Sequence, residues 1–521
     1  MAEDRPGGGS TYDYVVVGGG TAGSLLAARL SEDPDVSVLL LEWGPDDAEE
    51  PRARSINRWA EMLEGEYDLD YRSVPQARGN SGIRQARMRI LGGCSTANTM
   101  IAWRPLPADL DEWVALGADG WDAATVLPYY ERLQTPIHPV APADQNPYVR
   151  DVVRAASQAL GLPVRTTWND DDLGERASGT GFFEVGYTPE TNLRSSTSIH
   201  YLHAVRGRRN LTVVTGARAE RLLLEGRRVT GVRVRDRDGR PHDHAAGREV
   251  LVCCGAIDSP RLLQLSGIGP RDVLERAGIE VRLHLPGVGE NLMDHAEGLV
   301  VWETDRDVPG TRASGWDAGA MISLEGCPGQ PDVMMHFPVE AVADHAVAFG
   351  AVLPERIVSI APNVAKPYSR GRVWVESADP EAQPCVDYRY FTDPGGHDER
   401  MLVAGVRLAR QIARREPFAS WLVREVFPGP QVCSDDDVSR VARATHQTVY
   451  HVSGTCRMGA DDDPMAVLTP DLRVRGVDGL RVVDASVFPT LPSVNPVVTV
   501  MLVAERAADL VRDRRASANQ M

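Results

Sequence analysis

The chain has 521 residues, of which 43% are hydrophobic and 25% charged, and its formal net charge is −17. This composition is ordinary for a globular protein, and the length predicts roughly two to four domains, or two large interleaved ones. The acidic balance argues against nucleic acid or an anionic membrane as a partner and mildly favours a cationic substrate. No run approaches the ~18 apolar residues that a membrane span needs.

The cysteines and the opening residues bear on the cellular compartment. Seven cysteines are scattered singly apart from Cys253–Cys254, without the spacing of a disulfide framework or of a zinc site. The opening "MAEDRPGGGSTYDY" has no basic region followed by an apolar stretch, so it does not look like a signal peptide. We therefore expect free thiols, no metal centre and a cytoplasmic location.

A βαβ unit is predicted at the start of the chain. "YDYVVVGGG" (12–20) is a short β-branched run typical of a buried strand. "TAGSLLAARLSED" (21–33) then has helical spacing, and "VSVLLLEWG" (36–44) is a second buried strand. Buried strands joined by a helix indicate a parallel sheet.

Buried strands recur in the middle and near the end of the chain. Residues 210–248 alternate apolar and polar side chains in several short strands, and "EVLVCCGA" (249–256) is continuously apolar. "GLRVVDASVFP" (479–489) is a further buried strand, followed by an apolar-faced helix over 493–511. One α/β domain is thus assembled from three separated segments.

The sequence therefore predicts an α/β protein with two domains. The first is a Rossmann-like, cofactor-binding domain built from discontinuous segments, and the second is an α+β substrate-binding domain with an antiparallel sheet. We assign residues 1–145, 190–296 and 449–521 to the first domain, and residues 146–189 and 297–448 to the second.

A dinucleotide-binding motif lies inside the first βαβ unit. Gly18, Gly20 and Gly23 follow a strand and open a helix, so the first allows a tight turn, the second admits a pyrophosphate and the third lets the helix pack closely. Glu42 ends the second strand, where a carboxylate can accept hydrogen bonds from ribose hydroxyls. The motif predicts a dinucleotide and does not by itself choose between NAD and FAD.

The stretch "ILGGCSTANTM" (90–100) is a second place where a ligand can approach the backbone closely. Its residues are too small for a core helix and too flexible for a strand. We interpret this loop as backbone against which a ligand lies.

Four motifs resemble those of the glucose–methanol–choline (GMC) family of flavin oxidoreductases. They are "RILGGCSTAN" (89–98), "GAIDSPRLLQLSGIG" (255–269), "THQTVYHVSGTCRMG" (445–459) and "DASVFPTLPSVNPVVTV" (484–500). The resemblance covers essentially the whole chain and is greatest to the family members that oxidise choline. It implies FAD as cofactor and the oxidation of a primary alcohol to an aldehyde, with a second step to the acid left open, by hydride transfer to flavin N5.

The resemblance also implies roles for individual residues. His451 is placed as acceptor of the hydroxyl proton, a role that suits an imidazole, and Asn495 as second partner of the substrate oxygen. Asn495 and Pro496 also form a helix start by local rules, with Asn as N-cap and Pro in the first turn. The expected cofactor contacts are Gly18, Gly20, Thr21, Ala22, Gly23, Glu42, Gly92, Gly93, Ser95, Ala97, Asn98, Thr99, Ala219, Asp484, Ala485, Asn495, Pro496 and Thr499.

The expected substrate pocket suits an ammonium group. A quaternary ammonium needs aromatic faces and a carboxylate, and the resemblance supplies Trp59, Trp316, Tyr450, Glu297, His295 and His336. Val342 stands where the choline-oxidising members have an aromatic residue, and Glu340 adds a carboxylate to the same loop. These two departures suit a larger or more polar alcohol.

Ala97 is the third departure. The choline-oxidising members carry at this position a histidine joined covalently to the flavin, and alanine has no atom that could form this bond. We therefore expect FAD to be bound non-covalently.

Several alternatives remain open at this point. The alcohol is choline, or the hydroxymethyl group of a nucleoside, an aminosugar or another specialised metabolite. The family also contains flavin-bearing lyases that catalyse no net redox reaction. The electron acceptor is O₂ or another oxidant, and a homodimer is the family expectation.

Overall fold

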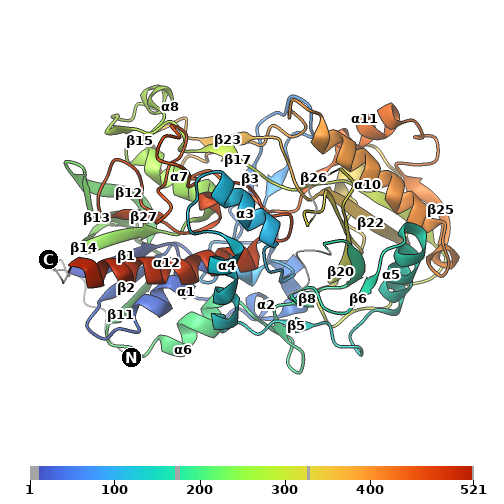
Figure 1. Cartoon of the computed structure of the whole chain (residues 1–521), viewed down its shortest axis with the longest axis horizontal. Helices are drawn as coiled ribbons and strands as arrows, with labels where there is room; N and C mark the ends of the chain where they lie inside the picture. Colours follow the sequence, from blue (N-terminus) through green and yellow to red (C-terminus); the bar gives the residue numbers. More distant parts are fainter. Residues whose placement is uncertain (1–10, 171–176, 326–328, 519–521) are drawn as a thin grey trace.

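Two large sheets organise the chain, one in each half of an elongated molecule (Figure 1). The computed structural model describes residues 11–170, 177–325 and 329–518. Both ends of the described chain lie in the same half, on the left of Figure 1. Within these ranges no helix combines the length and the apolar character that crossing a bilayer requires.

The first sheet contains the strands that the sequence predicts to be buried. Its parallel part has the order β11-β2-β1-β14-β27, and an antiparallel meander through β13 and β12 extends it from β14. The strands are β1 (Thr11–Val17), β2 (Val38–Glu42), β11 (Leu211–Thr215), β12 (Arg218–Glu225), β13 (Arg228–Arg235), β14 (Pro241–Val252) and β27 (Leu480–Val482). The Rossmann-like sheet is therefore built from the start, the middle and the end of the chain.

The long strand β14 belongs to both the antiparallel and the parallel part of this sheet. Its first residues pair antiparallel with β13, and its last residues, Val250–Val252, pair in parallel with both β1 and β27. The parallel strands are continuously apolar because helices cover them, among them α1 (Thr21–Leu30) and α12 (Val497–Ala518), which pack against each other.

The second sheet has nine strands and is antiparallel apart from the β6–β7 pair. Its strands are β6 (Val164–Arg165), β7 (Gly179–Phe182), β18 (Ala296–Glu297), β19 (Val300–Thr304), β20 (Ala318–Ile322), β21 (Val333–His336), β22 (Ile357–Val364), β25 (Leu422–Phe427) and β26 (Gln447–Thr448). The amphipathic helices α5 (Pro147–Leu160) and α10 (His397–Ala413) cover it, and α11 (Asp435–Thr445) packs on α10. The fold is the expected α/β domain joined to an α+β domain.

Most of the remaining elements are short. The remaining helices are α2 (Pro51–Arg54), α3 (Pro107–Ala115), α4 (Ala123–Val126), α6 (His203–Val205), α7 (Gly255–Leu265), α8 (Arg271–Arg276) and α9 (Asp344–Ala348). The remaining strands form small sheets: β3 (Tyr71–Arg72) with β4 (Arg84–Gln85), β5 (His138–Pro139) with β8 (Glu184–Val185), β9 (Tyr187–Thr188) with β10 (Leu193–Arg194), β15 (Ile268–Gly269) with β16 (Leu283–His284), and β17 (Glu290–Leu292) with β23 (Gly371–Trp374) and β24 (Cys385–Asp387). The domain boundaries that we assigned from the sequence stay a prediction.

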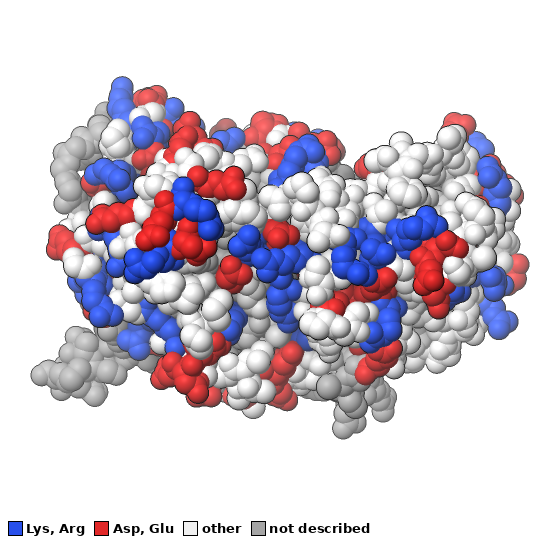
Figure 2. All heavy atoms as spheres, turned by 90° about the horizontal axis from the view of Figure 1, so that it is seen from above, with Lys and Arg blue, Asp and Glu red and all other residues white. Residues whose placement is uncertain are grey.

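The charged side chains are mixed by sign on the surface. On the face seen in Figure 2, acidic and basic groups lie next to one another rather than in separate fields. Many of them pair, as in Arg233–Asp243 on the antiparallel meander. This face therefore presents no extended field of a single sign.

Candidate active site

One cavity of ≈ 380 Å³ runs between the two sheets and is lined by both halves of the molecule. Its lining includes the glycine turn after β1, the end of β2 and side chains of the antiparallel sheet. A ligand in this cavity contacts residues from the beginning, middle and end of the chain.

The three glycines of the turn have different roles: two are needed for packing within the protein and one borders the cavity. A Cβ on Gly18 would stand 2.6 Å from the Cys253 carbonyl oxygen, and one on Gly23 would stand 1.9 Å from the Gly18 oxygen. At Gly20 the nearest atom to such a Cβ would be the Cα of Gly93, at 3.8 Å. Gly18 and Gly23 are therefore required by the protein itself, whereas Gly20 leaves its space to the cavity.

The loop over 90–100 packs directly on this turn. The Gly92 N–H donates to the Gly19 carbonyl (2.8 Å), and a Cβ on Gly93 would stand 2.8 Å from the Cα of Gly20. Gly92 and Gly93 both have positive φ, at 85° and 51°, as the chain enters a short 3₁₀ helix, Gly93–Thr96. The small residues of the loop therefore serve two contacts, one with the glycine turn and one with the cavity.

Glu42 holds the turn at the end of β2. One carboxylate oxygen accepts from the Gly19 N–H (2.8 Å) and the other from the Gly44 N–H (2.7 Å). Burial raises the pKa of this carboxyl to about 7, and the backbone hydrogen bonds oppose that rise. The remaining lone pairs of Glu42 lie at the cavity wall.

His451 is the centre of a buried polar cluster in the cavity. Its backbone N–H donates to Asp294 Oδ1 (2.8 Å), its Nδ1 lies 2.8 Å from Nδ1 of His295, and its Nε2 lies 3.3 Å from Nδ2 of Asn495. Burial lowers the pKa of His451 well below its ordinary value, and nearby His295, His336 and Arg87 lower it further. His451 is therefore neutral near pH 7 and able to accept a proton.

The contacts of His451 define its tautomer. The Asn495 Nδ2 can only donate, so the His451 Nε2 that faces it is the accepting nitrogen and the ring proton lies on Nδ1. That Nδ1–H then donates to Nδ1 of His295, whose pKa burial lowers to about 3. The Oδ1 atom of Asn495 is buried and has no hydrogen-bond partner among the described residues. A substrate hydroxyl that enters between these two side chains would donate its single proton to His451 Nε2 and accept from Asn495 Nδ2, in place of their mutual contact.

Asn495 differs from its expected local role. Helix α12 begins at Val497, two residues after it, and the Val500 N–H donates to the Pro496 carbonyl (2.9 Å). The predicted N-cap position was therefore wrong by one residue, because the Asn495 side chain lies against His451.

The opposite wall carries the residues expected to hold an ammonium group. The carboxylate of Glu297 lies 2.8 Å from Nδ1 of His336 and accepts from Nε2 of Gln447 (3.1 Å). Trp59 and Trp316 meet edge to face with ring centroids 6.4 Å apart, and Trp316 in turn lies 5.6 Å from the His336 ring. All of these side chains line the cavity, so its wall is aromatic and acidic.

Most of the predicted site residues lie together in this cavity. Those in its lining are Gly18, Gly20, Thr21, Ala22, Glu42, Trp59, Gly93, Ala97, Asn98, Thr99, Ala219, Glu297, Trp316, His336, Val342, Tyr450, His451, Asp484, Ala485, Asn495 and Pro496. Outside the lining are Gly23, Gly92, Ser95, His295, Glu340 and Thr499.

The residues outside the lining have other surroundings. Gly23 and Gly92 shape the two backbones described above, and the Ser95 hydroxyl donates to the Gly92 carbonyl (2.6 Å). Thr499 is buried in α12, and His295 lies behind His451. Glu340 is exposed.

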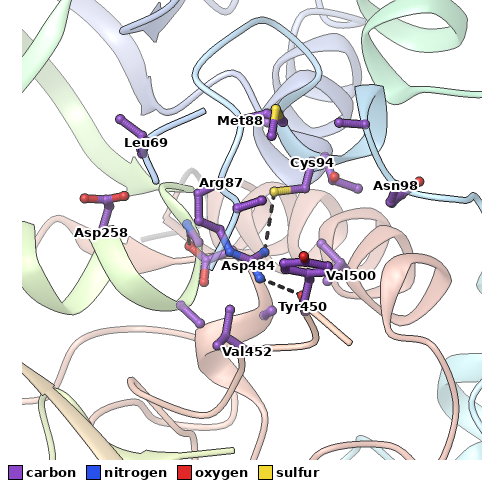
Figure 3. A pocket seen from close by; sticks show the side chains of 18 of the residues that line it. Leu69, Arg87, Met88, Cys94, Asn98, Asp258, Tyr450, Val452, Asp484 and Val500 are labelled. Atoms are coloured by element: carbon purple, nitrogen blue, oxygen red, sulfur yellow. Dashed lines mark hydrogen bonds between the residues drawn. The ribbon is translucent and has the colours of Figure 1, made fainter. Parts of the chain in front are cut away.

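The sequence analysis missed an arginine and an aspartate in this region. Figure 3 shows Arg87 between Cys94 and Tyr450; its guanidinium donates to the Cys94 sulfur (3.4 Å) and to the Tyr450 carbonyl (2.6 Å). Asp294 accepts from the Thr448 and Tyr390 hydroxyls as well as from the His451 N–H. Arg87 lies three residues before the loop over 90–100, and Asp294 directly precedes the predicted site residue His295, so neighbourhood in sequence could have drawn attention to both.

The cavity fits FAD by the chemistry of its walls. Gly20 offers bare backbone at a helix start, Glu42 offers a carboxylate to a ribose, and the N-terminal end of α12 borders the cavity with Pro496 and Val497. The unpartnered Asn495 Oδ1 and Thr499 Oγ1 add buried polar atoms at the same helix start.

Comparison with known families identifies the class of this protein. Family models described as GMC oxidoreductase match residues 12–297 and 367–504. The chain belongs to the GMC oxidoreductase family and is an FAD-dependent alcohol oxidoreductase.

Individual relatives agree with this assignment. The chain is 43% identical to choline oxidase of Arthrobacter globiformis, over 97% of this chain and 95% of that one. It is 36% identical to an oxygen-dependent choline dehydrogenase of Photobacterium profundum, over 96% and 93% of the two chains. Among solved structures, pyridoxine 4-oxidase from Mesorbium loti is similar with a TM-score of 0.89 at 32% identity, covering 96% of this chain and 99% of that one.

Proposed function

We propose that this enzyme oxidises a small primary alcohol that carries an ammonium group, with choline as the first candidate, to the aldehyde. The observation that carries the proposal is Glu297, a carboxylate only 2% exposed that lines the cavity among Trp59, Trp316 and Tyr450. Its partners in the described ranges are His336 and Gln447, and no lysine or arginine there pairs with it. A substrate cation would complete this site.

The cofactor site follows from the same cavity. Gly20, Gly93, Glu42, Ala219 and Asp484 would hold FAD, which when bound supplies a hydride acceptor for the alcohol carbon. Ala97 lies in the lining with only a methyl group, which supports a non-covalent cofactor. Molecular oxygen is the proposed electron acceptor, because the two curated relatives are named as an oxidase and as oxygen-dependent.

The protein's own part in the reaction is to orient the alcohol and take its proton. The Nε2 atom of His451 accepts the hydroxyl proton, and the Asn495 amide holds the same oxygen. His295, fixed against His451 Nδ1, keeps the accepting nitrogen on the cavity side. The aromatic wall around Glu297 excludes water from the ammonium end of the substrate.

A second candidate substrate is favoured by Val342. This half-buried aliphatic side chain lines the cavity on the segment after β21, and it takes up less space than an aromatic ring would. The wider wall suits the hydroxymethyl group of a nucleoside or an aminosugar. An aminosugar would also satisfy the carboxylate of Glu297.

Anaerobic titration of the purified holoenzyme distinguishes these substrates. We expect choline to bleach the visible flavin bands and 3,3-dimethyl-1-butanol, its neutral isostere, to do so only at far higher concentration. Bleaching by an aminosugar or nucleoside but not by choline would transfer the assignment to the second candidate. Equal potency of choline and the neutral isostere would refute the ammonium site, and a flavin that no alcohol bleaches would indicate lyase chemistry. A homodimer stays a prediction, to be checked by light scattering.

A further inference from the structure

Lys366 is the sole lysine among the 56 basic residues of the chain, and it is buried. Its ammonium lies 3.0 Å from Asp109 Oδ1 and 2.5 Å from Glu112 Oε2, and it donates to the Leu491 carbonyl (3.1 Å). An ammonium directs its protons to several separate acceptors, whereas a guanidinium presents a planar fork. The three acceptors come from two different segments, which explains why arginine does not replace lysine here.

Asp109 ties the same cluster to the segment that leads to Asn495. Its Oδ2 accepts from the Ser493 N–H (2.9 Å) and its Oδ1 from the Ser493 hydroxyl (2.8 Å). Together with the bond from Lys366 to Leu491, this fixes residues 491–493, two residues before Asn495, on helix α3. The position of the Asn495 amide therefore depends on a buried ion cluster of Lys366, Asp109 and Glu112.

The cluster also reaches His295, the partner of His451. Burial is the largest cause of the low pKa of His295, and the charge of Lys366 is the next; the carbonyls of Ala365 and Pro492 act in the opposite direction. Ala365 precedes Lys366, and Pro492 lies between the two residues that the cluster binds. Both chain segments beside His295 are thus held by Lys366.

We propose that Lys366 is a positioning residue for alcohol oxidation: its ammonium fixes the 490–495 segment and the chain beside His295, so that Asn495 Nδ2 and His451 Nε2 are held in place to bind the substrate oxygen and accept its proton. The proposal rests on the role given to His451 above. It concerns a residue that is not part of the cavity lining.

Other charged groups near His295 and His451 also influence how readily these histidines are protonated. Asp294 lies at the His451 backbone, Arg87 and His336 oppose a positive charge on His451, and Glu297 lies behind His336. These groups stay unchanged in the variants chosen below. A difference in the pH dependence of flavin reduction between variant and parent can therefore be attributed to the Lys366 cluster.

Two substitutions alter the cluster charge in opposite senses. Lys366→Met removes the cation and leaves two carboxylates, so protonation of the histidines becomes easier. Glu112→Gln removes one carboxylate, whose side chain is one-third exposed (33%), and makes protonation harder. Arg481→Met is the matched control, because it removes a buried cation from Glu249 in the first sheet.

The measurement is anaerobic flavin reduction by the best alcohol found for the parent, followed against pH in holoenzyme of verified FAD content. For Lys366→Met we expect the limiting rate constant to fall about tenfold to hundredfold with substrate affinity little changed, because a misplaced amide and base act on the chemical step. We also expect the apparent pKa of the acid limb in its plot of rate against pH to rise by about one unit. Glu112→Gln should keep the acid limb at or below that of the parent, and Arg481→Met should lower stability without changing either quantity.

An acid limb that moves equally in Lys366→Met and Glu112→Gln, or a Lys366→Met rate equal to the parent's, would overturn the proposal. Should Lys366→Met not fold, Lys366→Gln keeps a donor without the charge and is held to the same expectation. His451→Ala is measured in parallel. An unaffected His451→Ala rate would instead refute the proposed function, so the two failures are distinguishable.

Discussion

The Nδ1 atom of His336 lies 2.8 Å from Oε2 of Glu297, in a pair whose side chains are almost completely buried. The second oxygen of Glu297 accepts from Gln447, so each oxygen is oriented by one protein donor and keeps a lone pair. His336 is the last residue of strand β21, and both it and Glu297 line the cavity, so the sheet orients the carboxylate within the cavity wall.

Replacing Glu297 by glutamine should weaken a cationic substrate selectively. We expect the KM for choline to rise about tenfold to hundredfold, because removing one partner of a buried charge pair costs about 2 kcal/mol or more. The neutral isostere should be affected far less. Glu340→Gln, at an exposed position outside the lining, should change neither KM. Equal losses for the two alcohols in Glu297→Gln would contradict the assignment.

Replacing His451 by alanine should slow flavin reduction while leaving FAD bound. General base catalysis contributes about 10²- to 10⁴-fold, and we expect a loss in this range. The check is stopped-flow reduction together with the ratio of FAD to protein. A variant that reduces its flavin at the parent rate would exclude His451 as the proton acceptor.

Buried neutral histidines make stability depend on pH. His446 accepts the Asn80 N–H at Nε2 (2.9 Å), and burial lowers its pKa from 6.5 to about 3. Its folded pKa lies below its unfolded one, so its contribution is complete above pH 6.5 and is lost as the pH falls towards 3.

The variant His446→Gln isolates this contribution from those of the carboxylates. Relative to the parent, the variant should gain about 1.4 kcal/mol in unfolding free energy for each pH unit below 6.5. Denaturant unfolding of both proteins at pH 7.5, 6 and 5 measures the difference. A difference that stays constant with pH would show that His446 is not held neutral.

The cofactor should leave the polypeptide when the protein is denatured. The Ala97 methyl group lies in the cavity lining and offers no atom for a bond to the flavin. Acid precipitation should therefore put all of the yellow colour in the supernatant. Flavin fluorescence that migrates with the protein on a denaturing gel would show a covalent link through another residue.

Gly20 and Gly23 should respond differently to alanine. A methyl group at Gly20 finds ordinary contact with Gly93 but occupies cavity space, so Gly20→Ala should fold and bind FAD weakly. Gly23→Ala would bring the new carbon to 1.9 Å from the Gly18 oxygen and should lower Tm strongly in the apoprotein. Thermal unfolding and FAD titration of both apoproteins test the distinction. Equal FAD affinity of Gly20→Ala and the parent would show that Gly20 does not border the cofactor.

The predictions that succeeded rest on local patterns. The βαβ unit combines a continuous apolar strand, helical spacing and three glycines at fixed intervals, and each of these signals points to the same structure. The cavity residues drawn from the GMC resemblance lie together because the motifs that carry them converge on one cavity.

What escaped prediction consists of contacts between distant segments. Asp294 binds the backbone of His451 across 157 positions, and Lys366 joins Asp109, which lies 257 positions away. No local period encodes such pairs. Glu340 is a further case, because the sequence places its carboxylate in a substrate loop, and in the folded chain it is exposed and outside the cavity lining.

The route of the chain through the first sheet has a consequence for biosynthesis. Strand β27 and helix α12, which border Asp484 and Asn495, are translated well after β14 and α1, with which they pair and pack. A ribosome-bound chain therefore exposes its glycine turn long before the opposite wall exists. The cavity wall that carries Asn495 is therefore complete only after β27 and α12 have been synthesised and have joined β14 and α1.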